Sequence, residues 1–263
     1  MTTALPSPYE APELYDLALE GFRDDLAFWL DEARAAAPAP GPSARVLEVS
    51  CGTGRVLLHL LAHGIVADGV DLSDSMLARL AAKAKARGLE PRLYHADMRD
   101  FTTPERYRRV FIPFNGFAHC ETIEDQLRCL QCCREHLEPG GSVVVDMSYP
   151  GLAYWLDTRT DRVLEVESRH PETGHPVRMW DTRRKDRVAQ LQHSLVEIEE
   201  LDALGGVART HRFETRQRWV YPFELELLFR LAGYDRWQIL GGWDRRPLEV
   251  DGGQMLAFAW KAG

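Results

Sequence analysis

Apolar and polar residues recur along this chain with different periods, and the first part of the chain has a helical period. An amphipathic helical stretch is predicted over residues 11–36 from apolar residues near helical spacing, namely Leu14, Leu17, Phe22, Leu26, Trp29 and Leu30. The proline-rich segment APAPGPSA at 37–44 predicts a stiff linker that ends this stretch. Residues 1–44 are therefore expected to form an N-terminal helical segment with its linker.

From residue 45 onwards, short apolar runs alternate with helical patterns. RVLEVS, IVADGVD, PRLYHAD, RRVFIPF and SVVVDM are predicted to be five strands with helices between them. Ser73 is expected to cap one helix and Gly88 to stop it, while Thr122 and Asp125 resemble a capping box. Strands separated by helices indicate a parallel sheet that is covered on both faces.

A period of two replaces this pattern between residues 151 and 221. SLVEIEEL and HRFETRQRWVY alternate in this way, and Gly205 and Gly206 are expected to form the turn between them. This segment therefore predicts an antiparallel β insertion.

The last part of the chain returns to the first pattern. A helix is expected to begin at Pro222 and to end at Gly233, followed by an antiparallel pair of strands, YDRWQIL and QMLAFAWKA. We therefore predict an α/β fold in which 45–150 and 222–263 form a doubly wound, mostly parallel seven-stranded sheet, with helices on both faces.

Composition narrows the classes of function. The chain has 263 residues, of which 45% are hydrophobic and 27% charged, as is ordinary for a globular protein. Its formal charge of −8 argues against binding to nucleic acid, whose affinity depends on neutralising phosphates. Acidic residues near the N-terminus, the absence of a long apolar window and an odd number of cysteines predict a cytoplasmic protein with reduced thiols and no membrane span.

The cysteines of the helix after Thr122 admit two interpretations. Cys129, Cys132, Cys133 and His136 form the pattern C-x-x-C-C-x-x-H, which resembles a set of metal ligands. Structural zinc sites, however, usually draw pairs of ligands from separate turns. Because these cysteines lie beside leucines on one predicted helix, we favour packing in the core and predict no metal site.

The segment VLEVSCGTGRVLLHL, residues 46–60, is predicted to form a strand, a loop with two glycines and a helix. Glycines at such a turn let a ligand approach the backbone closely. A nucleotide-hydrolase loop is disfavoured, because Arg55 follows Gly54 where that loop needs lysine. A dinucleotide fingerprint is weakened, because Leu57 stands at the position of its third glycine. Asp71, at the end of the second predicted strand, is placed to accept hydrogen bonds from a free ribose.

These residues resemble the motifs of class I S-adenosylmethionine-dependent methyltransferases. EVSCGTG, residues 48–54, is similar to the first motif, GVDLSDSML to the second, HADMRDF to the segment that brackets adenine, and HLEPGGSVVVDM to the turn into the fifth strand. The N-terminal helical stretch and the β insertion are similar to those of small-molecule members, including amino-sugar and glycine-type N-methyltransferases. The resemblance covers about 45–147 and implies a Rossmann-like core that binds S-adenosyl-L-methionine and releases S-adenosyl-L-homocysteine.

The resemblance also implies a set of cofactor-binding residues. It implies Glu48, Ser50, Gly52 and Gly54 along the amino-acid part, Asp71 on the ribose, Leu72 and Met76 beside the adenosine, and Asp97 and Met98 on the adenine. Two positions depart from the family pattern. Ser50 replaces the first glycine and is expected to fit with its backbone in the β region. Arg109, before the fourth strand, stands where the family often has an acid.

The segment FIPFNGFAHCET at the end of the fourth predicted strand is expected to face the methyl group. Phe114 would form an apolar wall, and Asn115 would contact the amino group of the cofactor through its backbone or amide. His119 is the candidate base, because its ordinary pKa of about 6.5 suits proton removal near neutrality. Tyr15 is expected to close over the carboxylate or the methyl group. Ordinary packing remains the alternative for both His119 and Tyr15.

The sequence thus predicts methyl transfer to a nitrogen or oxygen of a small-molecule acceptor. The β insertion would cover the site and shape the acceptor pocket, or pair with a second subunit in a homodimer. A face with Arg209, Arg212, Arg216 and Arg218 would attract an anionic acceptor such as a nucleotide-linked sugar, or else pair with nearby acids. The alternatives are a nicotinamide-dependent oxidoreductase and a non-catalytic cofactor-binding interaction protein.

Overall fold

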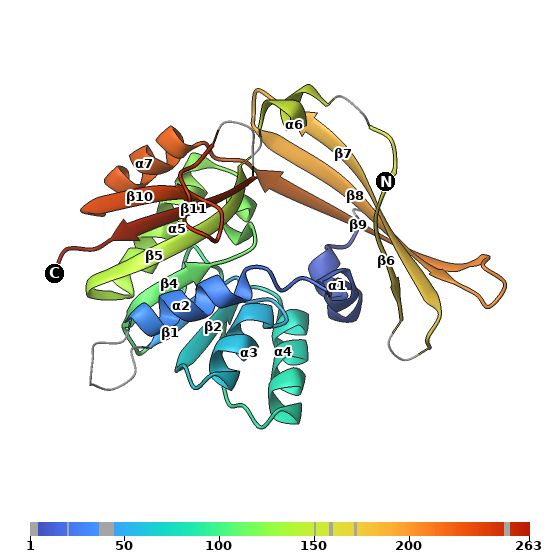
Figure 1. Cartoon of the computed structure of the whole chain (residues 1–263), viewed down its shortest axis with the longest axis horizontal. Helices are drawn as coiled ribbons and strands as arrows, with labels where there is room; N and C mark the ends of the chain where they lie inside the picture. The colour runs from blue at the N-terminus through green and yellow to red at the C-terminus, as the bar shows by residue number, and fades with distance from the viewer. Residues whose placement is uncertain are drawn as a thin grey trace.

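The computed structural model describes residues 5–19, 21–36, 45–149, 151–157, 160–170, 173–249 and 253–263. The linker predicted at 37–44 lies outside these residues. Within them the chain forms a seven-stranded sheet with helices on both faces and a separate four-stranded sheet (Figure 1). None of the helices found among these residues is long and apolar enough to cross a membrane.

The seven-stranded sheet has the order β10-β11-β5-β4-β1-β2-β3. Its strands are β1 (Val46–Val49), β2 (Ala67–Asp71), β3 (Arg92–His95), β4 (Tyr107–Ile112), β5 (Leu137–Tyr149), β10 (Arg236–Gly241) and β11 (Gly253–Trp260). β11 runs antiparallel to both of its neighbours, while β5, β4, β1, β2 and β3 run parallel to one another. The predicted doubly wound, mostly parallel sheet is therefore confirmed.

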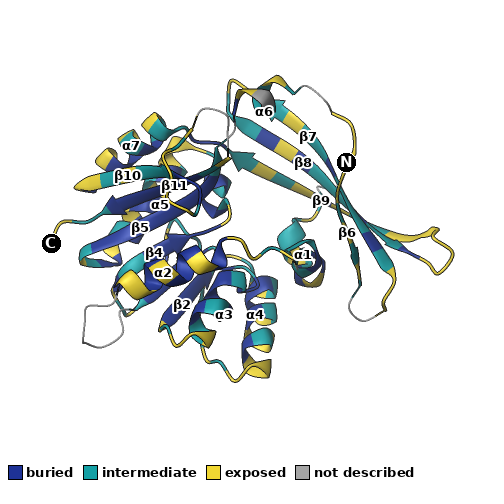
Figure 2. Ribbon diagram, viewed as in Figure 1, coloured by how far each residue is buried: buried dark blue, intermediate teal, exposed yellow. Residues whose placement is uncertain are grey.

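Two hydrophobic clusters cover the two faces of this sheet. On β5, Val143 and Val145 belong to the cluster that includes residues of α5 (Ile123–Glu135) and α7 (Pro222–Leu231). Val144 points the other way, into the cluster formed with α2 (Leu26–Ala36), α3 (Arg55–Ala62) and α4 (Asp74–Ala86). Because successive side chains of a strand alternate between faces, the apolar run of β5 fills both clusters. Figure 2 shows these strands as the most buried part of the molecule.

The cysteines predicted to pack in the core do so. Cys129 and Cys133 are fully buried on α5 within a hydrophobic cluster. His136, directly after the helix, donates from Nδ1 to the carbonyl of Cys132 at 2.8 Å. The Thr122 hydroxyl accepts from the Asp125 backbone at 3.1 Å, as predicted for a capping box. The Asp125 carboxylate does not complete the box and instead pairs with Arg99 at 2.8 Å.

The N-terminal region differs from the single helical stretch that the periodicity predicts. It forms η1 (Pro8–Glu10), α1 (Pro12–Leu19) and α2, and residues 21–25 interrupt the helices. Gly21 lowers helix propensity in this interval. Asp25, directly before α2, bonds both Arg55 on α3 and the indole nitrogen of Trp29, so its place is fixed by tertiary contacts.

The insertion is an antiparallel sheet of order β6-β7-β8-β9, as predicted. It follows α6 (Leu152–Leu156) and consists of β6 (Val163–Arg169), β7 (Pro176–Asp186), β8 (Leu191–Leu201) and β9 (Val207–Arg218). Gly205 takes a positive φ of 83° in the turn from β8 to β9. Arg209 and Arg212 are three positions apart on β9 and therefore lie on opposite faces, so the predicted single arginine face is wrong.

Helix α1 lies between the two sheets (Figure 1). Leu14 and Leu17 on one side of α1 form a small hydrophobic cluster with Val177, Ile198 and Phe213 of the insertion sheet. The N-terminal region therefore joins the insertion to the seven-stranded core and helps to enclose the space between them.

Candidate active site

A cavity of about 1110 Å³ lies between the carboxyl ends of the parallel strands, the N-terminal region and the insertion sheet. Nine of the predicted site residues line it, namely Tyr15, Ser50, Gly52, Asp71, Leu72, Asp97, Met98, Phe114 and His119. Glu48, Gly54, Met76 and Asn115 are not part of its described lining. The ends of β1, β2, β3 and β4 thus meet at one cavity, where ligands of open α/β sheets bind.

The loop after β1 has a left-handed backbone at three positions. Ser50, Gly52 and Gly54 have φ values of 62°, 52° and 82°. A Cβ atom at Gly54 would lie 2.6 Å from Cγ of Leu80, so a glycine is needed there for α3 to pack against α4. The expectation that Ser50 keeps a β-region backbone is wrong. Its side chain fits because Gly116 lies against it, where an added Cβ would be 3.0 Å from the Cβ of Ser50.

Asp71 holds the loop after β1 against the start of α4. Its Oδ2 accepts from the Gly52 backbone at 2.7 Å, and its Oδ1 accepts from the Ser73 backbone at 2.9 Å. Burial raises the pKa of Asp71, and these backbone hydrogen bonds oppose the rise. A carboxylate has about four lone-pair sites, so each oxygen can still accept another hydrogen bond from the cavity.

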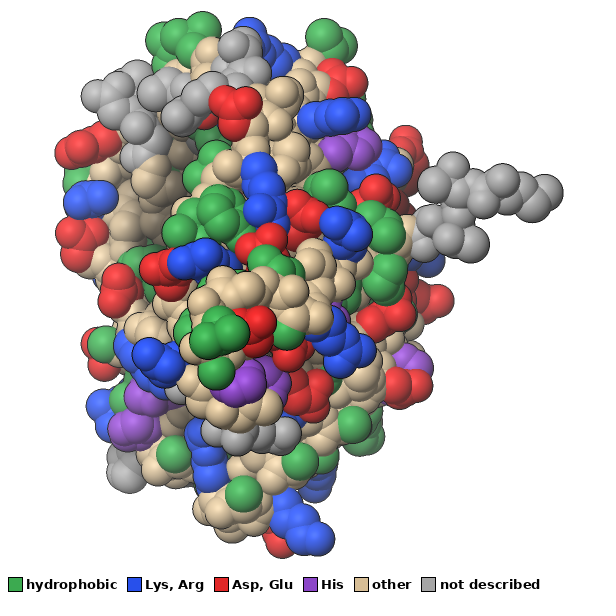
Figure 3. All heavy atoms as spheres, turned by 90° about the vertical axis from the view of Figure 1, so that its right-hand side faces the viewer, with side chains coloured by type: hydrophobic (Ala, Val, Ile, Leu, Met, Phe, Trp, Pro, Cys, Tyr) green, Lys and Arg blue, Asp and Glu red, His purple; other side chains and the backbone are tan. Residues whose placement is uncertain are grey.

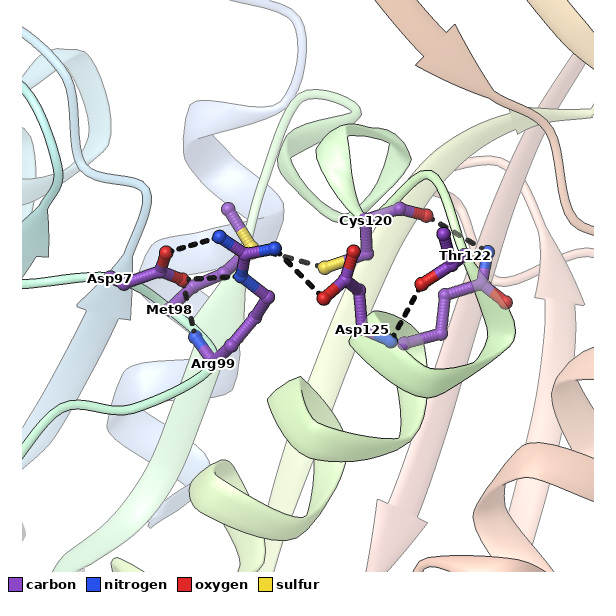
Figure 4. A network of polar contacts seen from close by, with 7 residues as sticks. Asp97, Met98, Arg99, Cys120, Thr122 and Asp125 are labelled. Atoms are coloured by element: carbon purple, nitrogen blue, oxygen red, sulfur yellow. Dashed lines mark hydrogen bonds and ion pairs between the residues drawn. The ribbon is translucent and has the colours of Figure 1, made fainter.

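Asp97 lies on the loop after β3 and is held by Arg99 (Figure 4). Arg99 donates to both oxygens of Asp97, from Nε at 2.9 Å and from Nη2 at 2.6 Å, and its Nη1 donates to Asp125 at 2.8 Å. Hydrogen bonding to Arg99 lowers the pKa of Asp97. The Met98 sulfur lies 3.5 Å from that of Cys120. The carboxylate of Asp97 and the thioether of Met98 are therefore fixed beside each other at one end of the cavity.

Glu48 lies within β1, below the cavity. Its side chain is only 3% exposed, and its Oε2 has no hydrogen-bond partner among the described residues. Burial raises the pKa of Glu48 to about 8, so the carboxyl group stays protonated near neutrality. A protonated carboxyl is a hydrogen-bond donor as well as an acceptor.

The loop after β4 has two successive non-glycine residues with left-handed backbones. Phe114 and Asn115 have φ values of 51° and 59°, a conformation that costs free energy outside glycine. Buried Asp146 on β5 accepts from the Phe114 backbone at 3.0 Å, and the Asn115 side chain accepts from the Ser148 backbone at 2.6 Å. The Asn115 side chain therefore holds β5 instead of entering the main cavity. The ring of Phe114 reaches the cavity and lies 5.3 Å from that of Phe22.

Helix α1 is fixed over the glycine loop by Asp16. Its carboxylate accepts from the Thr53 hydroxyl at 2.6 Å, from Arg79 at 3.0 Å and from Lys83 at 2.8 Å. This places the neighbouring residue, Tyr15, on Gly52, where a Cβ would lie 4.0 Å from its Cε1. Burial raises the pKa of Tyr15 to about 12, so it remains a neutral phenol.

Arg109 stands where the family often has an acid, and its charged partner comes from the N-terminal region. Arg109 lies within β4, not before it, and pairs in register with Val46 and Ser142. Its Nε lies 3.9 Å from Oε2 of buried Glu32 on α2. This pair joins α2 to the amino-terminal half of β4, whereas the loop that reaches the cavity follows the carboxyl end of the strand.

Tyr9 is a cavity residue that the sequence analysis missed. Its hydroxyl lies 2.7 Å from Nε2 of His119, and the two rings meet edge-on at 5.3 Å. Burial lowers the pKa of His119, so the ring is neutral at physiological pH. The sequence does contain a local signal for this turn, because Ser7, Pro8 and Glu10 match a capping box with proline at its start.

The insertion sheet supplies the cavity wall opposite the core. Arg184, His193 and Arg216 are register partners on three adjacent strands and all line the cavity. Arg216 also pairs with Glu121 at 2.8 Å. Arg212 instead pairs with Glu197 at 2.9 Å. Figure 3 shows acidic and basic side chains intermixed on the outer face of the molecule on the right-hand side of Figure 1.

Comparisons with known proteins agree with this geometry. Residues 46–141 match a family model described as a methyltransferase domain. A dTDP-3-amino-3,6-dideoxy-alpha-D-glucopyranose N,N-dimethyltransferase of Streptomyces fradiae is 33% identical over 138 residues, which cover 52% of this chain and 52% of that protein. The chain thus spans about half the length of the curated relatives it matches.

Solved structures are similar over nearly the whole chain. The CcbJ methyltransferase from Streptomyces caelestis is 26% identical with a TM-score of 0.73, covering 93% of this chain and 98% of that one. Streptomyces venezuelae DesVI is 25% identical with a TM-score of 0.72, covering 96% and 98%. Residues 46–141 therefore form a methyltransferase domain, and the chain resembles class I S-adenosylmethionine-dependent methyltransferases of the amino-sugar type.

Proposed function

We propose that this chain transfers a methyl group from S-adenosylmethionine to the nitrogen of a small-molecule acceptor, an amino sugar. The observation that carries the proposal is Asp71, which ends β2 and holds the Gly52 backbone while facing the cavity. A carboxylate at this place can accept from both hydroxyls of a free ribose and repels a ribose that carries a 2′-phosphate.

The lining of the cavity fits an adenosyl sulfonium. Asp71 and Leu72 would hold the ribose, while Asp97 and Met98 would hold the adenine amino group and ring. Ser50, Gly52 and Tyr15 would lie along the amino-acid part. Glu48, Gly54 and Met76 would act from behind this surface, because Glu48 carries an unpartnered buried oxygen and Gly54 permits the close packing of α3.

When bound, the cofactor supplies an electrophilic methyl group on a positively charged sulfur, which keeps the electron pair of the broken carbon–sulfur bond. The task of this chain is to align the acceptor nitrogen, exclude water and manage a proton. Phe114 and Tyr15 give the cavity an apolar wall near the glycine loop. Alignment of two reactants can supply about 7–11 kcal/mol of the barrier when the geometry is ideal.

The acceptor would occupy the part of the cavity next to the insertion. Arg184, His193 and Arg216 form a basic row there, suited to an anionic group such as the diphosphate of a nucleotide-linked sugar. Relatives named as dTDP-amino-sugar N,N-dimethyltransferases support nitrogen as the accepting atom.

Methyl transfer with labelled S-adenosylmethionine tests this function. Amino sugars, free and nucleotide-linked, are compared with matched sugars that carry a hydroxyl in place of the amine. We expect label on the amine only. Label on the hydroxyl sugars alone would contradict a nitrogen acceptor.

Calorimetry with S-adenosylhomocysteine and NAD separates the proposal from the nicotinamide alternative. We expect binding of S-adenosylhomocysteine and no heat from NAD, because Leu57 occupies the third glycine position of a dinucleotide fingerprint. Tight binding of NAD without a response to S-adenosylhomocysteine would overturn the proposal. Binding of S-adenosylhomocysteine without transfer to any amine, sugar or phenol would favour a non-catalytic binding protein.

A further inference from the structure

Helix α7 carries large apolar side chains on its outer side as well as its inner side. The inner side is buried in the cluster that covers one face of the seven-stranded sheet, and it consists of Leu225, Leu228 and Phe229. On the outer side, Phe223, Leu227 and Leu231 are 80%, 58% and 65% exposed (Figure 2). A surface helix normally carries polar residues on the side away from the core. The fold of the chain alone therefore gives no reason for these three residues, which we call the α7 stripe.

The α7 stripe is one continuous row. Its residues are spaced four positions apart, and residues at this spacing are neighbours on one face of a helix, about 6 Å apart along the axis. The row thus spans about 12 Å from Phe223 to Leu231. Single exposed apolar residues are ordinary on a protein surface, whereas a contiguous exposed row indicates an interaction site.

Two residues of opposite charge flank the α7 stripe. Glu224 and Arg230 stand three positions before and three positions after Leu227, which places them about 60° to either side of the row. Glu224 accepts from the Tyr221 backbone at 2.7 Å and from the Gln190 side chain at 3.0 Å, in both cases with Oε2, so its Oε1 can still accept. Arg230 is exposed and lies over an aromatic ring, a contact that leaves its N–H groups able to donate.

A two-fold axis through Leu227 makes the outer side of α7 complementary to itself. In an antiparallel pair of helices this axis relates each position before Leu227 to the position equally far after it, so Phe223 faces Leu231 of the second copy. The same axis brings Glu224 of each copy beside Arg230 of the other. In a parallel pair these two charges would lie six residues apart, about 9 Å along the axis, and out of contact. Antiparallel pairing thus matches both the apolar row and its flanking charges.

We infer that a second copy of this chain docks on α7, with the two α7 stripes packed antiparallel around a two-fold axis at Leu227. Such an interface uses the same patch on both copies and closes as a dimer. The stripe supplies the apolar centre of the interface, and the two ion pairs lie at its rim, where they fix the register. This inference is independent of the proposed function, and it places the second copy on the core instead of on the β insertion.

Leu227→Glu tests the dimer, because it sets two carboxylates against each other at the axis and leaves the buried side of α7 intact. Sedimentation equilibrium should show a dimer for the wild type and a rise of about 100-fold in the dimer Kd for the variant. Leu204→Glu is the matched control and should remain dimeric, because Leu204 is 97% exposed in the turn between β8 and β9. A monomeric wild type, or a dimer lost only in Leu204→Glu, would overturn the inference.

Leu227→Cys gives a reading that does not depend on loss of binding. The five native cysteines are buried, so mild oxidation acts on the introduced thiol. We expect a disulfide-linked dimer for Leu227→Cys and none for the control Leu204→Cys. Absence of the link in Leu227→Cys, or equal linkage in both variants, would contradict an axis at this position.

Glu224→Gln and Arg230→Gln test the antiparallel register. Glutamine removes the charge of Glu224 and keeps the cap at the start of the helix, because a capping box accepts either residue. Each single variant should raise the dimer Kd about fivefold, and the double variant should raise it no further, because the two groups form one pair. Effects that multiply in the double variant would overturn the pairing. None of these measurements uses turnover, so an inactive enzyme would overturn the proposed function and leave the dimer standing.

Discussion

The cavity has two ends that are built differently. Asp71 lines one end and Arg184 lines the other. The proposed cofactor end uses residues 50–98, on loops that follow the parallel strands β1, β2 and β3, of which β1 and β2 are buried (Figure 2). The proposed acceptor end combines Tyr9 and His119 with residues of β7, β8 and β9, whose sheet is far less buried (Figure 2). The positions of the residues at the cofactor end are determined by strand ends that are close together in sequence. Those at the acceptor end are determined by strand register and by contacts between residues far apart in the chain.

The two regions also differ in how their charges are paired. Asp25 is fully buried and binds Arg55 with both oxygens, which joins the N-terminal region to α3 of the core. Arg212 on β9 pairs with Glu197 across the insertion sheet, and its side chain is 57% exposed. A buried pair that loses one partner leaves a charge without compensation, whereas an exposed pair is replaced by water.

Asp25→Ala is expected to have the largest effect of the four variants, and it acts on the free energy of unfolding. Removing the carboxylate leaves Arg55 partly buried without its partner and should lower the free energy of unfolding by about 3–5 kcal/mol. Arg212→Ala in the insertion is the control and should cost less than about 1 kcal/mol. Urea denaturation of both variants measures the two values. Equal losses would contradict the distinction between a tightly joined core and a solvated insertion.

Asp71→Ala should weaken S-adenosylhomocysteine binding by about 2–3 kcal/mol, because it removes charge-assisted hydrogen bonds to the ribose. Asp100→Ala, at an exposed position on the loop after β3, is the control and should leave affinity unchanged. Calorimetry gives both affinities, and a thermal melt checks that the Gly52 loop remains folded. Full affinity in folded Asp71→Ala would rule out the ribose assignment.

Glu48→Gln should change how stability depends on pH. The pKa of Glu48 is about 8 in the folded state, above its ordinary value of 4.5. Between these values the folded state binds more protons than the unfolded state, so this group makes stability fall as pH rises. The variant should therefore gain about 1–2 kcal/mol on the wild type between pH 6.5 and pH 8. Denaturation at both pH values measures this, with exposed Glu90→Gln as the control; a constant difference would contradict a protonated Glu48.

Arg184→Ala should have the smallest effect of the four and should act on the acceptor end alone. We expect KM for an anionic acceptor to rise about tenfold, or about 1.4 kcal/mol, with no change in cofactor affinity. Arg212→Ala, outside the cavity lining, serves again as the control. Steady-state kinetics at constant ionic strength measures the change. An equal loss in both variants would indicate a general effect of charge rather than a binding row.

The sequence predicts most of the core because its signals are local. Gly52, Gly54 and Asp71 stand at strand ends that short apolar runs identify, and the cavity includes both Gly52 and Asp71. The backbone of Ser50 was not predictable, because what permits it is Gly116 on another loop. Tyr9 was missed for a similar reason. Its importance depends on His119, which is 110 positions away.

The insertion shows a second limit. Alternation along β9 predicts a strand, but it does not say which neighbours the strand will have. The row of Arg184, His193 and Arg216 exists only through the register of three strands. The prediction that grouped Arg209 with Arg212, Arg216 and Arg218 therefore placed Arg209 on the wrong face.

A crystal structure with S-adenosylhomocysteine tests the central claim most directly. The account predicts both ribose hydroxyls within hydrogen-bonding distance of the Asp71 carboxylate, with the adenine beside Asp97 and Met98 and the sulfur facing the space between Tyr9 and Phe114. A nucleoside bound elsewhere, or a ribose turned away from Asp71, would contradict it.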